Sequence, residues 1–130
     1  MILYEDAYFY ITKCPEYANV PGFFVIYENN NNWYSSAESI NRLALLEKTI
    51  RDEFMKCGIE LTGIYREEND NEFRVLIIPF DVKVLNSINI SPDLYQPYIK
   101  EYLDFFKPSN IEYDMLDTKV LTRLRELKNE

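Results

Sequence analysis

Apolar residues recur at helical spacing between residues 35 and 58, and this is the clearest pattern in the chain. These positions share one stripe about 120° wide at 100° per residue, and they are Ile40, Leu43, Leu46, Ile50, Phe54 and Cys57. Ser35 and Glu38 have the spacing of a capping box, and Gly58 can end a helix in the left-handed conformation. The pattern predicts a long helix over residues 35–58 that buries one face on a sheet.

Two segments before this helix are typical of strands. Residues 2–12 are rich in tyrosine and isoleucine and contain no breaker, and residues 23–28 form a short apolar run. Pro15, Pro21 and Gly22 lie between the two segments and predict a loop. We therefore expect two antiparallel strands, the second of them covered on both faces.

An alternating pattern followed by an apolar run predicts a hairpin over residues 59–80. Residues 59–66 alternate with the period of a half-buried strand, whereas residues 73–80 are almost continuously apolar, which favours a more central strand. Pro79 should end the pairing of this second strand or place it at an edge. The turn between the strands carries the carboxylates of Glu67, Glu68, Asp70 and Glu72. It lacks the ligand spacing and central glycine of a calcium loop, so no metal is assigned.

The C-terminal part of the chain has a mixed pattern. Residues 81–90 fit either a further strand or a crossing loop. Residues 91–107 are amphipathic, with Pro97 either at the start of a helix or at a kink within it. Residues 111–117 are acidic, with apolar residues between the charges. A last helix, over about 117–127, presents one apolar face made of Val120, Leu121, Leu124 and Leu127.

The predicted order of elements is strand, strand, helix, strand, strand, helix, helix. This order indicates one α+β domain over residues 1–130. We expect a mainly antiparallel sheet of about four strands, packed by the long helix, with two further C-terminal helices.

The charge balance points to a kind of partner. Twenty-two acidic residues against fourteen basic ones give a net charge of -8. This field repels phosphate and attracts cationic surfaces, so direct binding to nucleic acid is disfavoured. The long helix is nearly neutral, because Glu47 with Arg51 and Asp52 with Lys56 have the order of favourable i,i+4 pairs.

Several classes of site lack the residues that they need. The chain has no histidine, and its three glycines are not grouped, which removes the usual acid–base residue, the commonest metal ligand and a phosphate-binding loop. We expect a protein that is not an enzyme and that uses no cofactor or metal. A carboxylate-based enzyme or a small-ligand site lined by Tyr95, Tyr98 and Tyr102 remains an alternative.

The two cysteines and the hydropathy bear on the compartment. Cys14 and Cys57 have no metal or redox spacing, which favours reduced thiols, although a single bridge between them is compatible with the sequence. The first residues lack a signal-peptide pattern, and no run approaches the ~20 apolar residues of a membrane span. We expect a cytoplasmic protein without membrane contact.

Tyrosine beside carboxylate suggests recognition of a protein. The chain has eleven tyrosines; tyrosine is enriched in binding hot spots, and acidic groups speed the capture of a basic partner. The candidate contact residues lie in the acidic turn and in the segment near residue 115. They are Glu67, Glu68, Asp70, Glu72, Glu112, Tyr113, Asp114 and Asp117.

In size, acidity, lack of histidine and order of elements, the chain resembles bacterial toxin immunity proteins, such as those paired with contact-dependent growth inhibition toxins. The resemblance rests on overall character and on no motif, so it transfers no residue. It implies that the protein binds a cognate basic toxin nuclease and occludes its active site or substrate groove. The alternative within the binding class is a phage or mobile-element inhibitor that mimics nucleic-acid charge. The sequence does not indicate an oligomeric state.

Overall fold

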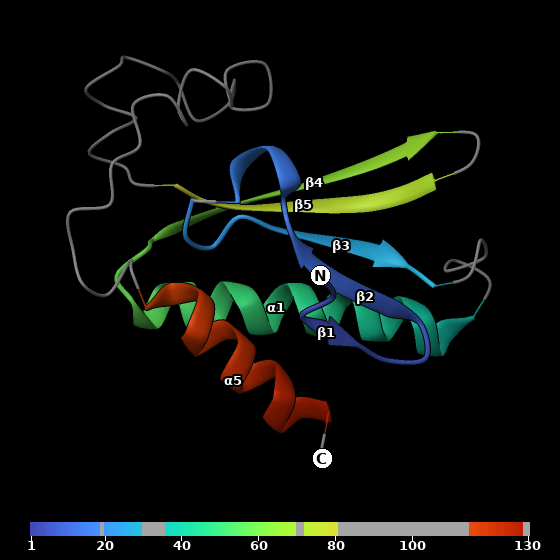
Figure 1. The fold of residues 1–130 in the computed structure, drawn as a ribbon. Coiled ribbons are helices and arrows are strands. Elements are labelled where there is room, and N and C mark those ends of the chain that lie inside the picture. Colours follow the sequence, from blue (N-terminus) through green and yellow to red (C-terminus); the bar gives the residue numbers. More distant parts are fainter. Residues whose placement is uncertain (19, 30–35, 70–71, 81–114, 129–130) are drawn as a thin grey trace.

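The structure is a computed structural model that describes residues 1–18, 20–29, 36–69, 72–80 and 115–128. Its elements are β1 (Tyr4–Glu5), β2 (Phe9–Lys13), the short 3-10 helix η1 (Pro15–Tyr17), β3 (Phe24–Glu28), α1 (Ala37–Lys56), β4 (Leu61–Asn69), β5 (Glu72–Phe80) and α5 (Leu116–Lys128). The strands form one antiparallel sheet in the order β1-β2-β3-β5-β4. The helices α1 and α5 lie on one side of the sheet and η1 on the other (Figure 1). The expected α+β class with a mainly antiparallel sheet is confirmed.

The N-terminal segment contains two strands, so the described residues form a sheet of five strands rather than the four expected. Residues 2–12 do not run as one strand because Asp6 turns the chain between β1 and β2. Its Oδ1 atom accepts hydrogen bonds from the backbone N–H groups of Tyr8 at 2.7 Å and Phe9 at 2.8 Å, a local alternative to the strand ladder that aspartate often provides. The expected antiparallel pairing with the next strand is confirmed for β2 and β3.

Helix α1 starts one residue later than the sequence suggests. Its N-cap is Ser36, whose Oγ atom accepts a hydrogen bond from the backbone N–H of Ser39 at 3.1 Å. The expected capping box of residue 35 with Glu38 is therefore wrong, and the Glu38 carboxylate instead accepts a hydrogen bond from the Tyr8 hydroxyl at 2.8 Å. Ile40 is 44% exposed rather than buried, because at 100° per residue it lies about 80° from Ile50, at the margin of the buried arc.

The end of α1 is the one that the sequence predicts. Gly58 has φ 85, the left-handed conformation that glycine adopts without a Cβ penalty. The N–H of Gly58 donates to the carbonyl of Met55 at 3.0 Å, and the N–H of Ile59 donates to that of Phe54 at 2.9 Å. These two bonds make a Schellman motif, and the side chains of Phe54 and Ile59 are both buried.

The ion pairs of α1 differ from the expected ones. The Glu47 side chain is only 10% exposed, and Arg66 of β4 reaches it with an Nη2 to Oε1 distance of 2.7 Å. Asp52 pairs with Lys48, which lies one turn before it, at 2.6 Å. The predicted pairs with Arg51 and Lys56 are therefore wrong, because Glu47 lies on the sheet side of the helix and Lys56 pairs with Glu53 at 3.0 Å.

The hairpin over residues 59–80 is confirmed, and β5 has the expected central place between β3 and β4. Pro79 lies beyond the last pair that β5 makes with β3, which is Phe24 with Ile77, so its missing N–H removes no bond from that ladder. On the helix side of the sheet, alternate strand residues form the main core with α1 and α5. They include Phe9, Ile11, Phe24, Ile26, Phe73, Val75 and Ile77.

Of the two C-terminal helices expected, the structure describes one. Helix α5 buries Leu116, Val120, Leu124 and Leu127, so the expected apolar face is present except that Leu121 is only half-buried. The other expected helix, over residues 91–107, and the ambiguous residues 81–90 lie outside the described residues. Cys14 and Cys57 are free thiols, buried in clusters on opposite sides of the sheet. Within the described ranges, neither long helix has the length and apolar character to cross a membrane.

Candidate binding face of the sheet

The sheet face away from α1, here called the open face, has two unlike ends. At one end, η1 and the residues before β3 cover a small core of Cys14, Phe23, Val25, Ile78 and Phe80. The ring of Tyr17 stacks on that of Phe23 at 5.6 Å between centroids. At the other end the side chains of Tyr10 and Tyr27 are only half-buried. The candidate site is this second end, where apolar surface remains accessible.

One residue from each strand contributes to a line of side chains across the open face, here called the tyrosine row. The strand register places Glu5 opposite Tyr10, and Tyr10 opposite Tyr27. It places Arg74 between Tyr27 and Glu67. Because residues directly opposite each other in an antiparallel sheet point to the same face, these five side chains share one surface. With strands about 4.8 Å apart, the row spans roughly 19 Å.

The centre of the row is an aromatic pair. The rings of Tyr10 and Tyr27 are stacked, with centroids 5.0 Å apart and planes at 19°. Next to them, Nε of Arg74 donates a hydrogen bond to Oε2 of Glu67 at 2.6 Å. That bond is the main reason why the pKa of Arg74 is raised, and a further contribution comes from Tyr27. Arg74 is thus held between a tyrosine and a carboxylate.

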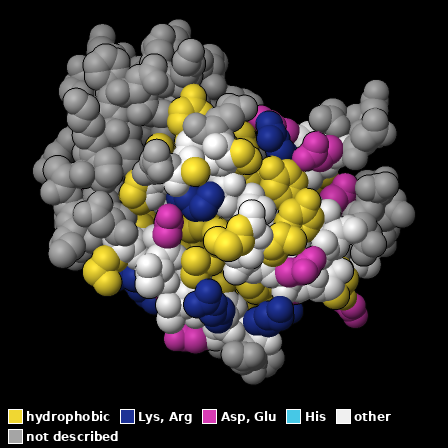
Figure 2. Space-filling view, viewed as in Figure 1, with side chains coloured by type: hydrophobic (Ala, Val, Ile, Leu, Met, Phe, Trp, Pro, Cys, Tyr) yellow, Lys and Arg dark blue, Asp and Glu magenta, His cyan; other side chains and the backbone are white. Residues whose placement is uncertain are grey.

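Two carboxylates act on the aromatic pair, Glu5 from β1 and Glu72 from β5. Burial raises the pKa of Tyr10, and the charges of its neighbours Tyr27, Glu72 and Glu5 raise it further. Glu5 and Glu72 are exposed, and neither has an ion-pair partner within the described ranges. Figure 2 shows hydrophobic side chains gathered over β2 and β3, with acidic side chains at the margin of this patch.

A groove adjoins the tyrosine row. It has a volume of about 560 Å³ and is lined by Met1, Leu3, Tyr10, Thr12, Lys13, Pro15, Ala18 and Tyr27. The lining is mainly apolar, and both rings of the aromatic pair contribute to it. The groove can therefore take an apolar side chain next to a polar group that lies on the row.

The predicted contact residues are separated by the fold. Glu67 and Glu72 lie on the open face, because they share it with Arg74, whereas Glu68 is opposite Phe73 and faces the helix side. Asp117 lies in the first turn of α5, away from these strands. Its carboxylate binds the backbone N–H of Gly22 at 2.7 Å.

The distance between these groups follows from the position of Gly22. A Cβ atom at Gly22 would meet Pro79, which lies seven residues, or roughly 24 Å, along β5 from Glu72. The predicted residues Asp70, Glu112, Tyr113 and Asp114 lie outside the described residues, as do Tyr95, Tyr98 and Tyr102. The described carboxylates of the acidic turn and Asp117 therefore do not form one surface.

Glu5, Tyr10, Tyr27 and Arg74 were not among the contact residues predicted from the sequence. A signal for one of them was present, because Tyr10 alternates with Phe9 and Ile11, which are buried on the helix side. The register that places these residues in one row depends on where the turn at Asp6 falls and on which strands are neighbours. Neither property follows from the alternation alone.

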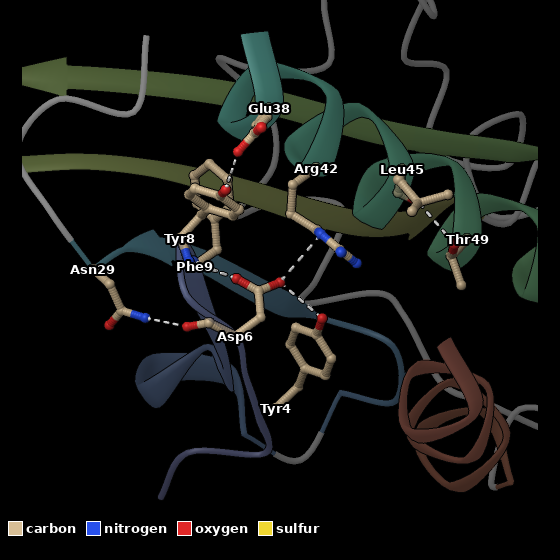
Figure 3. Close-up of polar contacts among 9 residues, drawn as sticks. All are labelled: Tyr4, Asp6, Tyr8, Phe9, Asn29, Glu38, Arg42, Leu45 and Thr49. Carbon is tan, nitrogen blue, oxygen red and sulfur yellow. Dashed lines mark hydrogen bonds and ion pairs between the residues drawn. The ribbon is translucent and has the colours of Figure 1, made fainter. Parts of the chain in front are cut away.

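A second polar cluster lies where the β1–β2 hairpin meets α1 (Figure 3). The Tyr4 hydroxyl donates to Oδ2 of Asp6 at 2.8 Å, and Nε of Arg42 lies 3.7 Å from the same atom. Asn29 donates from Nδ2 to the Asp6 carbonyl at 2.8 Å. Burial, and then the bond to Asp6, raises the pKa of Tyr4 well above its usual value. The contact of Arg42 with Asp6, and the bond from Tyr8 to Glu38, attach the hairpin to α1, so we assign the cluster a structural role.

In comparisons with known proteins, no family model and no curated protein matches this chain. Among the described residues, no three histidine, cysteine, aspartate or glutamate side chains come together as a metal site would require.

Proposed function

We propose that the chain is a non-enzymatic binding protein that recognises a basic protein through the open face of its sheet. The observation that supports this most is the tyrosine row, in which a stacked pair, Tyr10 and Tyr27, lies between carboxylates. Tyrosine supplies a large rigid contact area at low entropic cost, and it is common at the centre of binding sites.

The charge of the protein favours a basic partner. The net charge of -8 gives a field that accelerates association with a cationic surface. Glu5 and Glu72 bring that charge to the edge of the aromatic pair, where a partner would exclude water and strengthen the attraction.

The more specific proposal is that the partner is a toxin nuclease, as the resemblance to immunity proteins implies. A nuclease needs a basic groove for its substrate, and an acidic aromatic face is complementary to such a groove. An antagonist of this kind would act in the cytoplasm, where the nuclease meets nucleic acid. In this proposal the protein lowers nuclease activity by occupying the groove and carries out no chemistry of its own.

The test uses the purified product of the neighbouring gene and a pair of double variants. The first variant, Glu5→Lys with Glu72→Lys, alters the open face. The second, Glu60→Lys with Glu68→Lys, alters exposed carboxylates away from that face. Each double variant changes the net charge from -8 to -4, so the two share any effect of total charge.

We expect the first variant to weaken the complex at least about tenfold, because rim charges that attract the partner would repel it. The second variant should weaken it by less than about threefold. Isothermal titration calorimetry measures both affinities, and a nuclease assay measures inhibition. Equal losses in the two variants, or a neighbouring gene product that is acidic and does not bind, would contradict the proposal.

A further inference from the structure

The tyrosine row is asymmetric about its aromatic pair. On the β5 side, Tyr27 is followed by Arg74 and then by Glu67, so an arginine of the chain lies between a tyrosine and a carboxylate. On the β1 side, Tyr10 is followed by Glu5. Tyrosine and carboxylate are thus present on both sides, whereas the row contributes an arginine on one side only.

We infer that the β1 side of the row is a seat for an arginine of the partner, with the guanidinium on the ring of Tyr10 beside Glu5. The strand register places Glu5 directly opposite Tyr10 on the same face, so a cation over this ring is close to the Glu5 carboxylate. Glu72 lies on β5, and its charge also acts on Tyr10. Arginine fits better than lysine, because its planar group stacks on an aromatic ring while its N–H groups bind carboxylates.

The groove indicates what kind of residue the partner would carry next to that arginine. Tyr10 belongs both to the row and to the lining of the groove, together with Met1, Leu3 and Pro15. A side chain adjacent to the arginine would therefore enter a mainly apolar space of about 560 Å³. The partner segment that fits is an apolar residue next to an arginine.

This inference rests on the proposed function and makes it more specific, but its test needs no partner protein. The probes are two blocked dipeptides, N-acetyl-leucyl-arginine amide and N-acetyl-leucyl-citrulline amide. Citrulline has nearly the shape of arginine without its charge. Binding is followed by ¹H–¹⁵N NMR titration of the full chain, which reports both the affinity and the residues that are perturbed.

We expect the arginine peptide to bind about three- to tenfold more tightly than the citrulline peptide, since a cation–π contact and exposed ion pairs each contribute modestly. The perturbed signals should centre on Tyr10, Tyr27 and Glu5. Glu5→Gln with Glu72→Gln should weaken the arginine peptide about threefold and leave the citrulline peptide unchanged. The control, Glu60→Gln with Glu68→Gln, should change neither peptide.

Two variants at residue 10 separate the ring from its hydroxyl. Tyr10→Phe keeps the aromatic face and should keep the preference for arginine, whereas Tyr10→Leu should remove it. Equal binding of the two peptides, a preference that survives Tyr10→Leu, or perturbations centred away from the row would overturn the arginine seat.

The seat and the proposed function can fail separately. If the peptides show no preference for arginine while Glu5→Lys with Glu72→Lys still weakens the partner complex, the seat is wrong and the open face remains the contact surface. If the peptides show the preference but both double lysine variants bind the partner equally well, the open face is not its contact surface.

Discussion

The Nζ atom of Lys13 lies 3.0 Å from Oδ1 of Asp117, which joins β2 to the first turn of α5 across 104 positions of the chain. The same ammonium donates to the carbonyl of Val20 at 2.6 Å, and the same carboxylate accepts from the N–H of Gly22. The Lys13 and Asp117 side chains are 17% and 36% exposed. One ion pair therefore holds the last helix against the loop that precedes β3.

We expect Asp117→Asn to lower the free energy of unfolding by about 1–3 kcal/mol, because it removes a charged acceptor from two hydrogen bonds. Burial already lowers the pKa of Lys13, and Asp117 opposes that effect. In the variant the pKa of Lys13 should therefore fall further. Urea unfolding measures the first effect, and NMR titration of the lysine side chain measures the second.

The control for this variant is Glu126→Gln, which removes an exposed partner of Arg123 in the same helix. It should change the free energy of unfolding by less than about 0.5 kcal/mol. An Asp117→Asn protein as stable as this control would mean that water replaces the lost contacts.

Two glycines with the same backbone conformation differ in the space around them. Gly22 and Gly58 have φ of 81 and 85. A Cβ at Gly22 would lie 2.5 Å from Cδ2 of Leu116 and 2.9 Å from Cγ of Pro79, whereas one at Gly58 would meet nothing within 4 Å. Alanine at Gly58 should cost about 1–2 kcal/mol of stability from backbone strain alone. Alanine at Gly22 should cost about 1–3 kcal/mol more, because overpacking adds to the strain.

Chemical denaturation of the two alanine variants, side by side with the wild type, tests this difference. Each variant carries the same substitution at a similar φ, so the backbone contribution cancels in the comparison. Similar losses at the two positions would show that Leu116 and Pro79 move aside without cost.

The raised pKa of Tyr4 predicts a loss of stability in alkali. Its usual value is 10.0, and in the folded protein the neutral phenol is favoured above that pH. Between the unfolded and the folded pKa the native state therefore holds more protons than the unfolded state, so the free energy of unfolding falls as pH rises above about 10. Below that range the contribution of Tyr4 is fully present.

The Tyr4→Phe variant should show a smaller alkaline decline, because it lacks this ionisable group. Urea unfolding at several pH values on either side of 10 measures the decline. Ultraviolet titration supplies a second check, since Tyr4 is one of the phenols, with Tyr8 and Tyr10, whose pKa is raised in the folded wild type. If the phenol that Tyr4→Phe removes ionises with the usual pKa of 10.0, the burial assigned to Tyr4 is wrong.

The hydroxyl of Thr62 is a buried group with no hydrogen-bond partner within the described ranges. Replacing Thr62 with valine keeps the shape and removes an unsatisfied polar atom, so it should raise the free energy of unfolding by about 0.5–1 kcal/mol. Thr12→Val is the matched control, because the Thr12 hydroxyl donates to the Lys13 carbonyl at 2.9 Å. Thermal unfolding should shift upward for the first variant and downward for the second, and a downward shift for both would contradict the prediction.

The complex with a basic partner should weaken as salt is added. Exposed carboxylates such as Glu5 and Glu72 are screened within about 8 Å at 0.15 M ionic strength. The dissociation constant should therefore rise steadily with salt for the wild type and more gently for Glu5→Lys with Glu72→Lys. Calorimetry at several salt concentrations gives both slopes, and a flat wild-type slope would mean that the aromatic pair dominates binding.

The sequence was sufficient where local chemistry and apolar periodicity agree. The end of α1 at Gly58, the central place of β5 and the apolar face of α5 all follow from such patterns. The start of α1 was harder, because adjacent serines offer two possible caps and only the structure selects Ser36. The turn at Asp6 was missed, because a single aspartate among tyrosines is a weak turn signal.

Only part of the candidate site could be predicted from the sequence. Glu67 and Glu72 stand out as acidic residues, but nothing in their immediate sequence separates them from Glu68, which faces the helices. The tyrosine row needs five strands in a particular order and register. The ion pair of Glu47 could not be predicted for the same reason. Its partner Arg66 belongs to β4, whereas the predicted partner Arg51 lies four residues away on the same helix.

The ladder between β3 and β5 has a consequence for how the chain folds. Among the described strands, every other pairing joins neighbours in sequence, whereas this one joins residues 24–27 to residues 74–77 through four pairs. The N-terminal meander and the hairpin of β4 with β5 can each form locally, but closing this ladder requires the connecting segment, which includes α1, to lose conformational entropy. We therefore expect the meeting of these two halves to limit the folding rate. The amides shared by β3 and β5 should exchange with solvent only when the whole domain unfolds.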